Sequence, residues 1–264
     1  MQFEDILYEA AEGIATITIN RPRVLNAFRA ETVDEMVDAF KDAWADRTVG
    51  VVILTGAGDR AFCVGGDQTV RTQGGYGGKQ ARSEIGLDVE DLHAIIREIP
   101  KPVIAAINGY AIGGGHVLHV LCDLSIAADT ARLGQVGPKV GSVDPGFGTA
   151  YLARVVGEKR AREIWYLCRQ YSAQDALAMG LVNHVVPAER LMDEARAWAR
   201  EILAMSPTAI KLAKASFNAD TDHIKGIGAL GMSALALYYQ SEEAAEGHRA
   251  FTERRPPDFA RFRR

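Results

Sequence analysis

The chain of 264 residues lacks the features that mark several classes of protein. No uninterrupted apolar run approaches the roughly 20 residues that a membrane span requires. The first residues, Met1–Asp5, carry acidic groups where a secretory signal peptide has a basic start and an apolar stretch. The formal net charge of −4 argues against a nucleic-acid-binding role. We therefore expect a cytoplasmic protein with neither a membrane nor a nucleic acid as partner.

Cysteine is scarce, and no CxxC pair occurs. The three cysteines, Cys63, Cys122 and Cys168, are widely spaced, which predicts reduced and mostly buried thiols. His116 and His119 precede Cys122 at three-residue spacing, but three ligands on one helix cannot surround a metal ion. We expect these side chains to pack or to form hydrogen bonds, and we expect no metal site.

Phosphate-binding loops are also missing, although the chain contains two glycine clusters at predicted strand-to-helix turns. Gly113–Gly115 follow the apolar run Val103–Ile107, and Gly65–Gly66 follow an earlier strand. Neither cluster continues as Gly-Lys-Ser/Thr, and no GxGxxG is present. A lone glycine cluster is more often just a tight connection. Two such turns, however, can supply the two backbone N–H donors of an oxyanion hole.

Strands alternate with helices in the first half of the chain, and helices dominate the second half. Periodicity predicts a β-hairpin over residues 6–20, strands 49–55, 103–107 and 123–127, and helices 31–44, 89–99 and 116–121. The pattern favours an α/β core with a helical C-terminal extension. That extension contains predicted helices 150–156, 159–168, 172–179, 188–205, 207–219 and 227–251. Two glycine-rich stretches, 71–86 and 135–148, are predicted as loops near the site, the first of them mobile.

Several sequence blocks, in their order and spacing, resemble the crotonase (enoyl-CoA hydratase/isomerase) superfamily along almost the whole chain. These blocks are Asn20–Pro22 with Asn26–Phe28, Ala61–Asp67, Gly109–Gly115 and Cys122–Asp123. The resemblance implies a crotonase (ClpP-like) spiral of ββα units over residues 1–200. It implies a helical region over 201–264 that forms trimers and covers the active site. Acyl-CoA substrates, no tightly bound cofactor, and homotrimers or hexamers made of two trimers are also implied.

The resemblance further assigns site residues. In that superfamily the thioester oxygen lies between two backbone amides, which match Gly66 and Gly114. Further residues are implied to bind the CoA or acyl part of the substrate, namely Arg23, Val24, Ala27, Gly65, Asp67, Gln68 and Tyr76. Phe251 and Arg254 are candidates for contacts with CoA phosphates or with a neighbouring subunit.

The acid–base residues decide which reaction is expected. The two glutamates of water-adding hydratases match Val117 and Gly137, neither of which can move a proton, and this argues against a simple hydratase. The chain offers Asp144 instead, with Ser142 two residues before it and, in an extended segment, on the same side. A buried aspartate can exchange a proton beside a β-keto thioester. It can also simply end a turn before Pro145; the resemblance favours the catalytic role.

Two subfamilies resemble different blocks of the chain. Gly134–Ser142 and Ala161–Tyr171 are similar to naphthoyl-CoA synthases, which close a ring by a Dieckmann-type condensation. Similarity to hydrolases that open 2-ketocyclohexanecarboxyl-CoA to pimeloyl-CoA is found in Met1–Asp5, in Gly141–Gly146 with Gly148–Ala150, and in Ser216–Asn218. We expect ring-opening hydrolysis, with ring closure as the alternative and a non-catalytic RNA-binding or scaffolding relative as a third interpretation.

The synthase resemblance carries additional implications for the site. It implies bicarbonate held by residues that match Gln135, Gly137 and Trp165. It also implies a substrate-binding arginine that matches Arg71, and a tyrosine that matches Tyr239 and reaches a neighbouring active site. In the ring-opening reaction, Asp144 would act as the acid–base group, with Ser142 and Tyr239 orienting the ketone.

Overall fold

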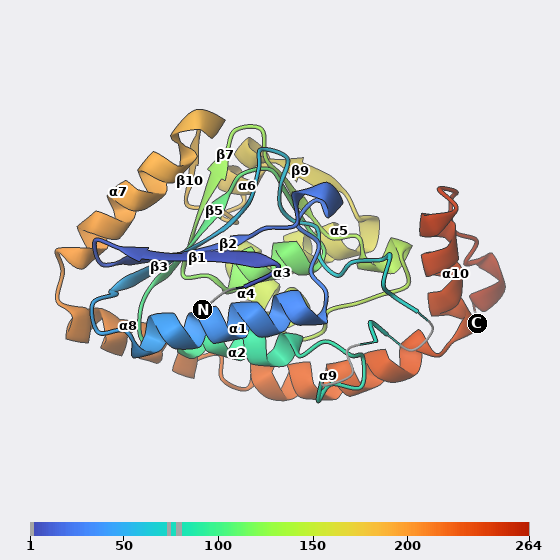
Figure 1. Cartoon of the computed structure of the whole chain (residues 1–264). Coiled ribbons are helices and arrows are strands. Elements are labelled where there is room, and N and C mark those ends of the chain that lie inside the picture. The colour runs from blue at the N-terminus through green and yellow to red at the C-terminus, as the bar shows by residue number, and fades with distance from the viewer. Residues whose placement is uncertain (1–2, 73–74, 78–80, 264) are drawn as a thin grey trace.

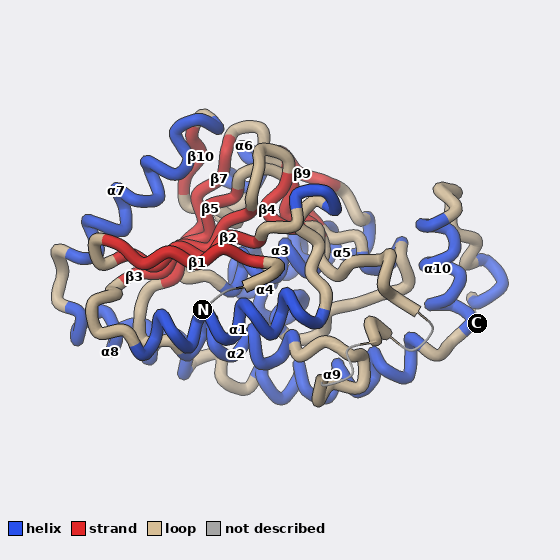
Figure 2. Tube along the Cα trace, in the orientation of Figure 1, coloured by secondary structure: helices blue, strands red, loops and turns tan. Residues whose placement is uncertain are grey.

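The computed structural model describes residues 3–72, 75–77 and 81–263. Its larger sheet has the strand order β1-β2-β3-β5-β7-β10, in which β1 and β2 form an antiparallel hairpin and all other neighbours are parallel. Figure 2 shows this sheet at the centre of the molecule. Its strands are β1 (Ile6–Ala11), β2 (Ile14–Ile19), β3 (Val51–Gly56), β5 (Val103–Ile107), β7 (Leu124–Ala128) and β10 (His184–Val186).

A second, smaller sheet has the order β4-β6-β8-β9, and every strand in it has three residues. Sequence periodicity did not predict this sheet, because three residues are too few to reveal an alternating pattern. Its strands are β4 (Ala61–Cys63), β6 (Tyr110–Ile112), β8 (Arg132–Gly134) and β9 (Gln170–Ser172). The two glycine turns follow β4 and β6, so this sheet brings them side by side.

Helices cover both faces of the larger sheet (Figure 1). In that view α1, α2, α8 and α9 lie below the strands, and α7 lies on the opposite side. The ten helices of the described residues are α1 (Ala30–Ala45), α2 (Val89–Glu98), α3 (Gly114–Leu121), α4 (Leu152–Val156), α5 (Glu158–Leu167), α6 (Ala173–Ala178), α7 (Leu191–Leu203), α8 (Pro207–Ala219), α9 (Ile224–Tyr239) and α10 (Glu242–Thr252).

The central strands are apolar on both faces because both faces are covered. In β3, Val52 and Leu54 pack into the main core, while Val51 and Ile53 pack against α7. This division follows from the alternation of side chains along a strand. The continuous run Val103–Ile107 is buried in the same way, which explains why it shows no polar alternation. The predicted α/β core and N-terminal hairpin are confirmed.

The predicted helix over residues 227–251 is wrong in one respect, since the structure divides it into α9 and α10. The break falls at Gln240 and Ser241, and the Ser241 hydroxyl accepts a hydrogen bond from the amide of Ala244 at 3.1 Å. Serine in this position caps the start of a new helix. The apolar periodicity runs through the break and so concealed it.

The C-terminal helices are attached to the sheet through Lys214 on α8. Its buried Nζ donates to the Asp123 carboxylate at 2.6 Å and to the carbonyls of Ile96 and Lys101 at 3.1 and 3.0 Å. The boundary between a core (1–200) and a C-terminal region (201–264) stays a prediction. Within the described ranges, no helix combines the length and the apolar character needed to cross a bilayer. In the predicted loop 71–86, residues 73–74 and 78–80 lie outside the described part.

Candidate active site

The two glycine turns lie against each other. A Cβ atom added to Gly65 would lie only 2.7 Å from the amide nitrogen of Gly114, and one added to Gly114 would lie 3.3 Å from Cα of Gly65. Gly65 and Gly113 also have positive φ angles, +85° and +58°, which side-chain-bearing residues rarely adopt. Glycine is therefore required here both for the backbone conformation and for the close approach of the two turns.

Two amides in these turns are free to bind a ligand. Phe28 flanks Gly66 on both sides: its amide donates to the Gly65 carbonyl at 2.9 Å, and its carbonyl accepts from the amide of Asp67 at 2.8 Å. The amide of Gly66 has no partner in the described part of the chain, and Gly114 opens α3, where a helix leaves its first N–H groups without partners. Within the described residues neither amide donates to a backbone carbonyl. Two such amides in adjoining turns are the donors that an oxyanion hole requires, and this role stays a prediction.

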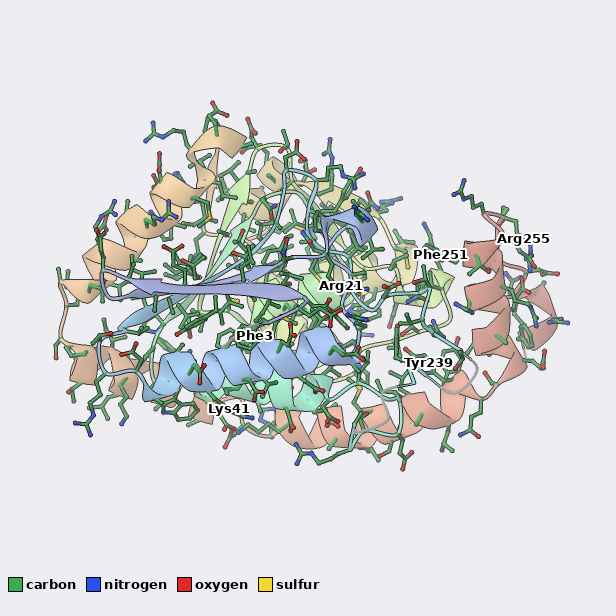
Figure 3. All side chains as sticks on the ribbon, viewed as in Figure 1. Phe3, Arg21, Lys41, Tyr239, Phe251 and Arg255 are labelled. Atoms are coloured by element: carbon green, nitrogen blue, oxygen red, sulfur yellow. The ribbon has the colours of Figure 1, made fainter. Side chains whose placement is uncertain are left out.

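Asp67 stabilises the first glycine turn, which contains Gly65 and Gly66. Its carboxylate forms an ion pair with Arg21 at 2.9 Å and accepts from the Thr69 hydroxyl at 2.7 Å. Arg21 lies near the middle of the molecule in Figure 3 and also pairs with Asp5 at 3.4 Å. The predicted ligand contact Asp67 does line the cavity, but its carboxylate is already paired.

A cavity of about 680 Å³ opens at the two turns. Most of the predicted site residues line it, whereas Arg71 and Arg254 do not. The lining residues among the predicted ones are Arg23, Val24, Ala27, Gly65, Gly66, Asp67, Gln68, Tyr76, Gly114, Gln135, Gly137, Ser142, Asp144, Trp165, Tyr239 and Phe251.

Sequence reasoning missed an apolar part of the wall. Ile85, Leu87 and Val89 precede or begin α2, and Met232 and Leu235 come from α9. These residues carry no motif, and their helical spacing in α9 is equally typical of ordinary core positions. The wall gives the cavity an apolar end suited to an acyl group.

Asp144 faces the cavity and is partly exposed to it, although protein surrounds the carboxyl group. Burial raises the pKa of this group to about 7, against a hydrogen bond from the Gly148 amide at 3.2 Å that lowers it; the nearby charge of Glu90 raises it further. A carboxyl group with this pKa can both accept and return a proton near neutral pH.

Ser142 and Tyr239 form a hydroxyl pair beside Asp144. The two oxygens are 2.7 Å apart, and both residues belong to the same chain. Tyr239 thus contacts the cavity of its own chain, and its implied contact with a neighbouring active site stays a prediction. Figure 3 labels Tyr239 at the end of α9, with Phe251 on the side of α10 nearer the body of the molecule.

Tyr76 and Gln68 link this hydroxyl pair to the first glycine turn. The amide Nε2 of Gln68 donates to the Gly66 carbonyl at 2.9 Å and to the Tyr76 hydroxyl at 3.0 Å. The Tyr76 ring lies edge-on to Tyr239, with centroids 6.4 Å apart. Burial raises the pKa of Tyr76, so its hydroxyl stays protonated and is a hydrogen-bonding group.

Arg71 does not reach the cavity, which corrects its implied role in substrate binding. Its guanidinium donates to the carbonyls of Val140 and Gly141 at 3.0 and 2.7 Å and to Gln68 Oε1 at 3.2 Å. The same group lies 4.2 Å from the centroid of the Tyr239 ring. Arg71 therefore holds together the glycine turn, the segment before Ser142 and the tyrosine.

We expect Arg71→Lys to lower kcat about tenfold, because lysine lacks the planar fork that binds two carbonyls while stacking on an aromatic ring. Steady-state kinetics and thermal melting of the variant would measure the effect. KM should change much less than kcat, since Arg71 does not line the cavity. An unchanged kcat would remove Arg71 from this positioning role.

Helix α10 closes one side of the cavity through close backbone packing. Gly247 of α10 lies against Gly141 so tightly that a Cβ on either residue would overlap backbone atoms. His248 Nε2 lies 3.1 Å from the Gln68 carbonyl, which joins α10 to the first glycine turn. Arg254 follows α10 with a φ of +55° and is exposed, so the structure does not bring it to the cavity.

The residues implied to hold bicarbonate do not fit an anion. Nε2 of Gln135 donates to the Gly113 carbonyl at 3.3 Å, and the indole Nε1 of Trp165 donates to the Gly148 carbonyl. A Cβ on Gly137 would lie 2.6 Å from the Ser142 carbonyl oxygen, so a glutamate there has no room either. Two of the expected donors are thus already used within the protein.

Burial keeps the cysteine thiols and the histidines His116 and His119 in their uncharged forms. Cys63, Cys122 and Cys168 are free and buried, as predicted. Burial raises the pKa of Cys63 to about 12, so its thiol is not ionised at neutral pH. Burial also lowers the pKa of His116 to about 3 and that of His119 well below its usual range. In the described part of the chain, no group of three His, Cys, Asp or Glu residues could hold a metal ion.

We expect Gly115→Ala to destabilise the fold by about 1–3 kcal/mol, because its Cβ would overlap the carbonyl of Cys63 and push α3 from β4. Gly226→Ala is the matched control, since its Cβ would have open space on α9. Denaturant unfolding of both variants measures the difference. Equal stability of the two variants would show that α3 and β4 can move apart without loss of stability.

The fold and the site together define a class, an α/β enzyme built around paired glycine turns. The chain belongs to the enoyl-CoA hydratase/isomerase family of the crotonase superfamily, whose profile matches residues 9–261. Members of this family act on acyl-CoA substrates and are commonly oligomeric. The predicted crotonase fold is thereby confirmed.

Solved structures of similar proteins cover the whole fold. An enoyl-CoA hydratase from Mycobacterium avium subsp. paratuberculosis K-10 is 29% identical over 98% of this chain and 99% of its own, with a TM-score of 0.87. An enoyl-CoA hydratase from Bacillus anthracis is 34% identical over 97% and 98%, with a TM-score of 0.75. A monofunctional enoyl-CoA isomerase from M. smegmatis is 30% identical over 83% and 94%, with a TM-score of 0.71.

Proposed function

We propose that the protein opens the ring of a cyclic β-keto acyl-CoA by hydrolysis, through a thioester enolate. The observation that carries this proposal is the position of Asp144, which lines the same cavity as the Ser142–Tyr239 hydroxyl pair. A hydratase of the two-glutamate type is disfavoured, because Val117 and Gly137 occupy the matching positions. One cyclic β-keto acyl-CoA of this kind, 2-ketocyclohexanecarboxyl-CoA, carries a ketone that such a hydroxyl pair can orient.

The proposed reaction assigns one role to each group. Asp144 accepts a proton from water, whose oxygen attacks the ring ketone. One hydroxyl of the Ser142–Tyr239 pair donates to the other, which donates its own proton to the ketone oxygen. The bond between the ketone carbon and the carbon next to the thioester then breaks. Its electrons form the thioester enolate, which the amides of Gly66 and Gly114 stabilise. Asp144 returns the proton to that carbon, and the former ketone becomes the carboxyl group of the open chain.

Two other reactions would use the same groups. Dieckmann-type ring closure of o-succinylbenzoyl-CoA also passes through a thioester enolate, and the tyrosine–serine pair would serve it equally. Isomerisation of a 3-enoyl-CoA needs one carboxyl group to move one proton, and a single unpaired cavity carboxylate favours it among the described residues. In all three, the two amides hold the thioester oxygen.

Assembly into a homotrimer, or into a hexamer of two trimers, is part of the proposal. Large apolar side chains are exposed on the C-terminal helices, with Leu212 and Phe217 on α8 and Leu230 and Leu237 on α9 each more than 60% exposed. Faces of this kind mark protein–protein contacts. Light scattering of the purified chain would give the mass of the assembly.

Three substrates separate the reactions, by product mass for ring opening and ring closure, and by the ultraviolet absorbance of the conjugated thioester for isomerisation. The protein is incubated with 2-ketocyclohexanecarboxyl-CoA, o-succinylbenzoyl-CoA and a 3-enoyl-CoA, each with and without Asp144→Asn. We expect the wild-type protein to add one water to the first substrate, and we expect no such product with Asp144→Asn. Loss of water from the second substrate would favour ring closure instead. Conversion of the third alone, to the conjugated isomer of unchanged mass, would replace ring opening by isomerisation.

A further inference from the structure

Gln135 has its amide orientation fixed from within the protein. Its Nε2 donates to the carbonyl of Gly113 at 3.3 Å and lies 3.4 Å from Nδ1 of His116. The Gly113 carbonyl can only accept, so it must face the NH₂ side of the amide and not the oxygen. The reversed amide would set two oxygens against each other. The orientation of Gln135 thus follows from the network and not from a free choice of rotamer.

The buried His116 completes this arrangement. Because the Gln135 NH₂ group points at Nδ1, that nitrogen accepts, and the ring proton sits on Nε2. Nε2 is buried without a partner among the described residues, and the ring is edge-on to His119 at a centroid distance of 4.9 Å. Burial keeps the ring neutral, as its lowered pKa indicates. His116 is therefore held as a hydrogen-bond acceptor for Gln135.

The remaining polar atom of Gln135, Oε1, is the one presented to the cavity. Gln135 lines the cavity, and Oε1 accepts no hydrogen bond from the described residues. It is also not among the fully buried atoms that lack a partner. Gln135 binds the carbonyl of Gly113, the residue just before the second oxyanion donor, Gly114. An acceptor therefore lies next to the place proposed for the thioester and its neighbouring carbons.

We propose that Gln135, positioned by Gly113 and His116, is a specificity residue. It selects acyl-CoA ligands that place a neutral hydrogen-bond donor, either a hydroxyl group or a bound water, near the thioester. The same acceptor repels an oxyanion, so a carboxylate or bicarbonate is disfavoured at this point. The inference rests on the proposal that the cavity binds an acyl-CoA, but not on ring opening, since binding alone expresses the selectivity.

Calorimetric titration with stable CoA esters tests this selectivity without turnover. The ligands are butyryl-CoA, each enantiomer of 3-hydroxybutyryl-CoA, and malonyl-CoA, which places a carboxylate at the same distance. We expect one hydroxy ester to bind roughly three- to tenfold more tightly than butyryl-CoA, the effect of one hydrogen bond. Malonyl-CoA should bind more weakly than the hydroxy ester, and added bicarbonate should change no affinity.

Three variants assign the effect to the network. Gln135→Met keeps the length of the side chain without the acceptor, and should bind the hydroxy ester and butyryl-CoA equally. His116→Leu should reduce the preference by freeing the amide. His119→Leu should keep the preference, because His119 packs on His116 but forms no hydrogen bond with Gln135 in the described part of the chain. Melting curves identify any variant that does not fold. If a histidine variant does not fold, the comparison of Gln135→Met with the wild-type protein still decides whether Gln135 causes the preference.

Several results would overturn the inference. Equal affinity of the wild-type protein for butyryl-CoA and both hydroxy esters would do so, as would tightest binding of malonyl-CoA or an unchanged preference in Gln135→Met. Failure of ring opening in the product assay, with the hydroxy preference intact, would reject only the proposed reaction. The two proposals therefore fail separately.

Discussion

Replacing Gly114 by proline will lower turnover about 10²–10³-fold while the chain stays folded, because proline removes the N–H of the second oxyanion donor. The position itself suits proline, since Gly114 is the first residue of α3, where the missing N–H breaks no helical hydrogen bond. The loss should fall on kcat more than on KM, because the enolate needs the donor more than the ground-state thioester does. Single-turnover kinetics would measure it.

Gly114→Ala supplies the control that makes this prediction specific. Any Cβ at this position would lie 2.7 Å from the edge of the Phe28 ring, so alanine and proline share the crowding at Cβ, while proline alone has a Cδ in place of the amide hydrogen. Alanine retains the N–H, and its loss of turnover should be much smaller. If the two variants lost activity equally, crowding would be the cause and the amide of Gly114 would have no part in the reaction.

Asp144→Asn is expected to lower turnover at least about a hundredfold, at the low end for general acid–base catalysis. Asparagine keeps the shape and can still accept from the Gly148 amide, but it cannot take a proton. In the wild type, kcat/KM should rise with pH through a midpoint near 7, where the carboxyl ionises. The kcat/KM of the variant should not rise with pH in this range. Wild-type kinetics in Asp144→Asn would return the residue to the role of a turn.

Stability gives an independent measure of the same group. The folded pKa of about 7 lies above the ordinary 3.8, so the folded protein binds this proton more tightly than the unfolded chain. The resulting stabilisation is complete below pH 3.8 and is lost as the pH rises through 7. Melting temperatures of Asp144→Asn relative to wild type should therefore rise between pH 4 and 8. A pH-independent difference would mean that the carboxyl is not buried in solution.

The sequence predicted well what local chemistry determines. Positive φ angles and close approach demand glycine at Gly65 and Gly113, so these turns were visible without coordinates. The buried strands β3, β5 and β7 were found from their apolar runs, whereas β10, with only three residues, was missed. Ser142 and Asp144 both line the cavity, but they do so from a segment that is neither helix nor strand.

What depended on contacts distant in sequence was not predictable. Arg71 carries the same charge whether it binds a substrate or the Val140 and Gly141 carbonyls, and only the folded chain distinguishes the two. Likewise, no pattern near Gln135 reveals that its amide is already bound to Gly113. Tyr239 lies 97 positions from Ser142, so its placement in its own cavity depends on the path of α9.

The glycine-to-glycine seam between α10 and Gly141 has a consequence for folding. Tyr239, Phe251 and the His248 contact with Gln68 all come from residues that follow the strands of both sheets in the chain. Both sheets can therefore form before this side of the cavity is in place. Docking of α10 should accordingly be the folding step after which the cavity can retain a ligand.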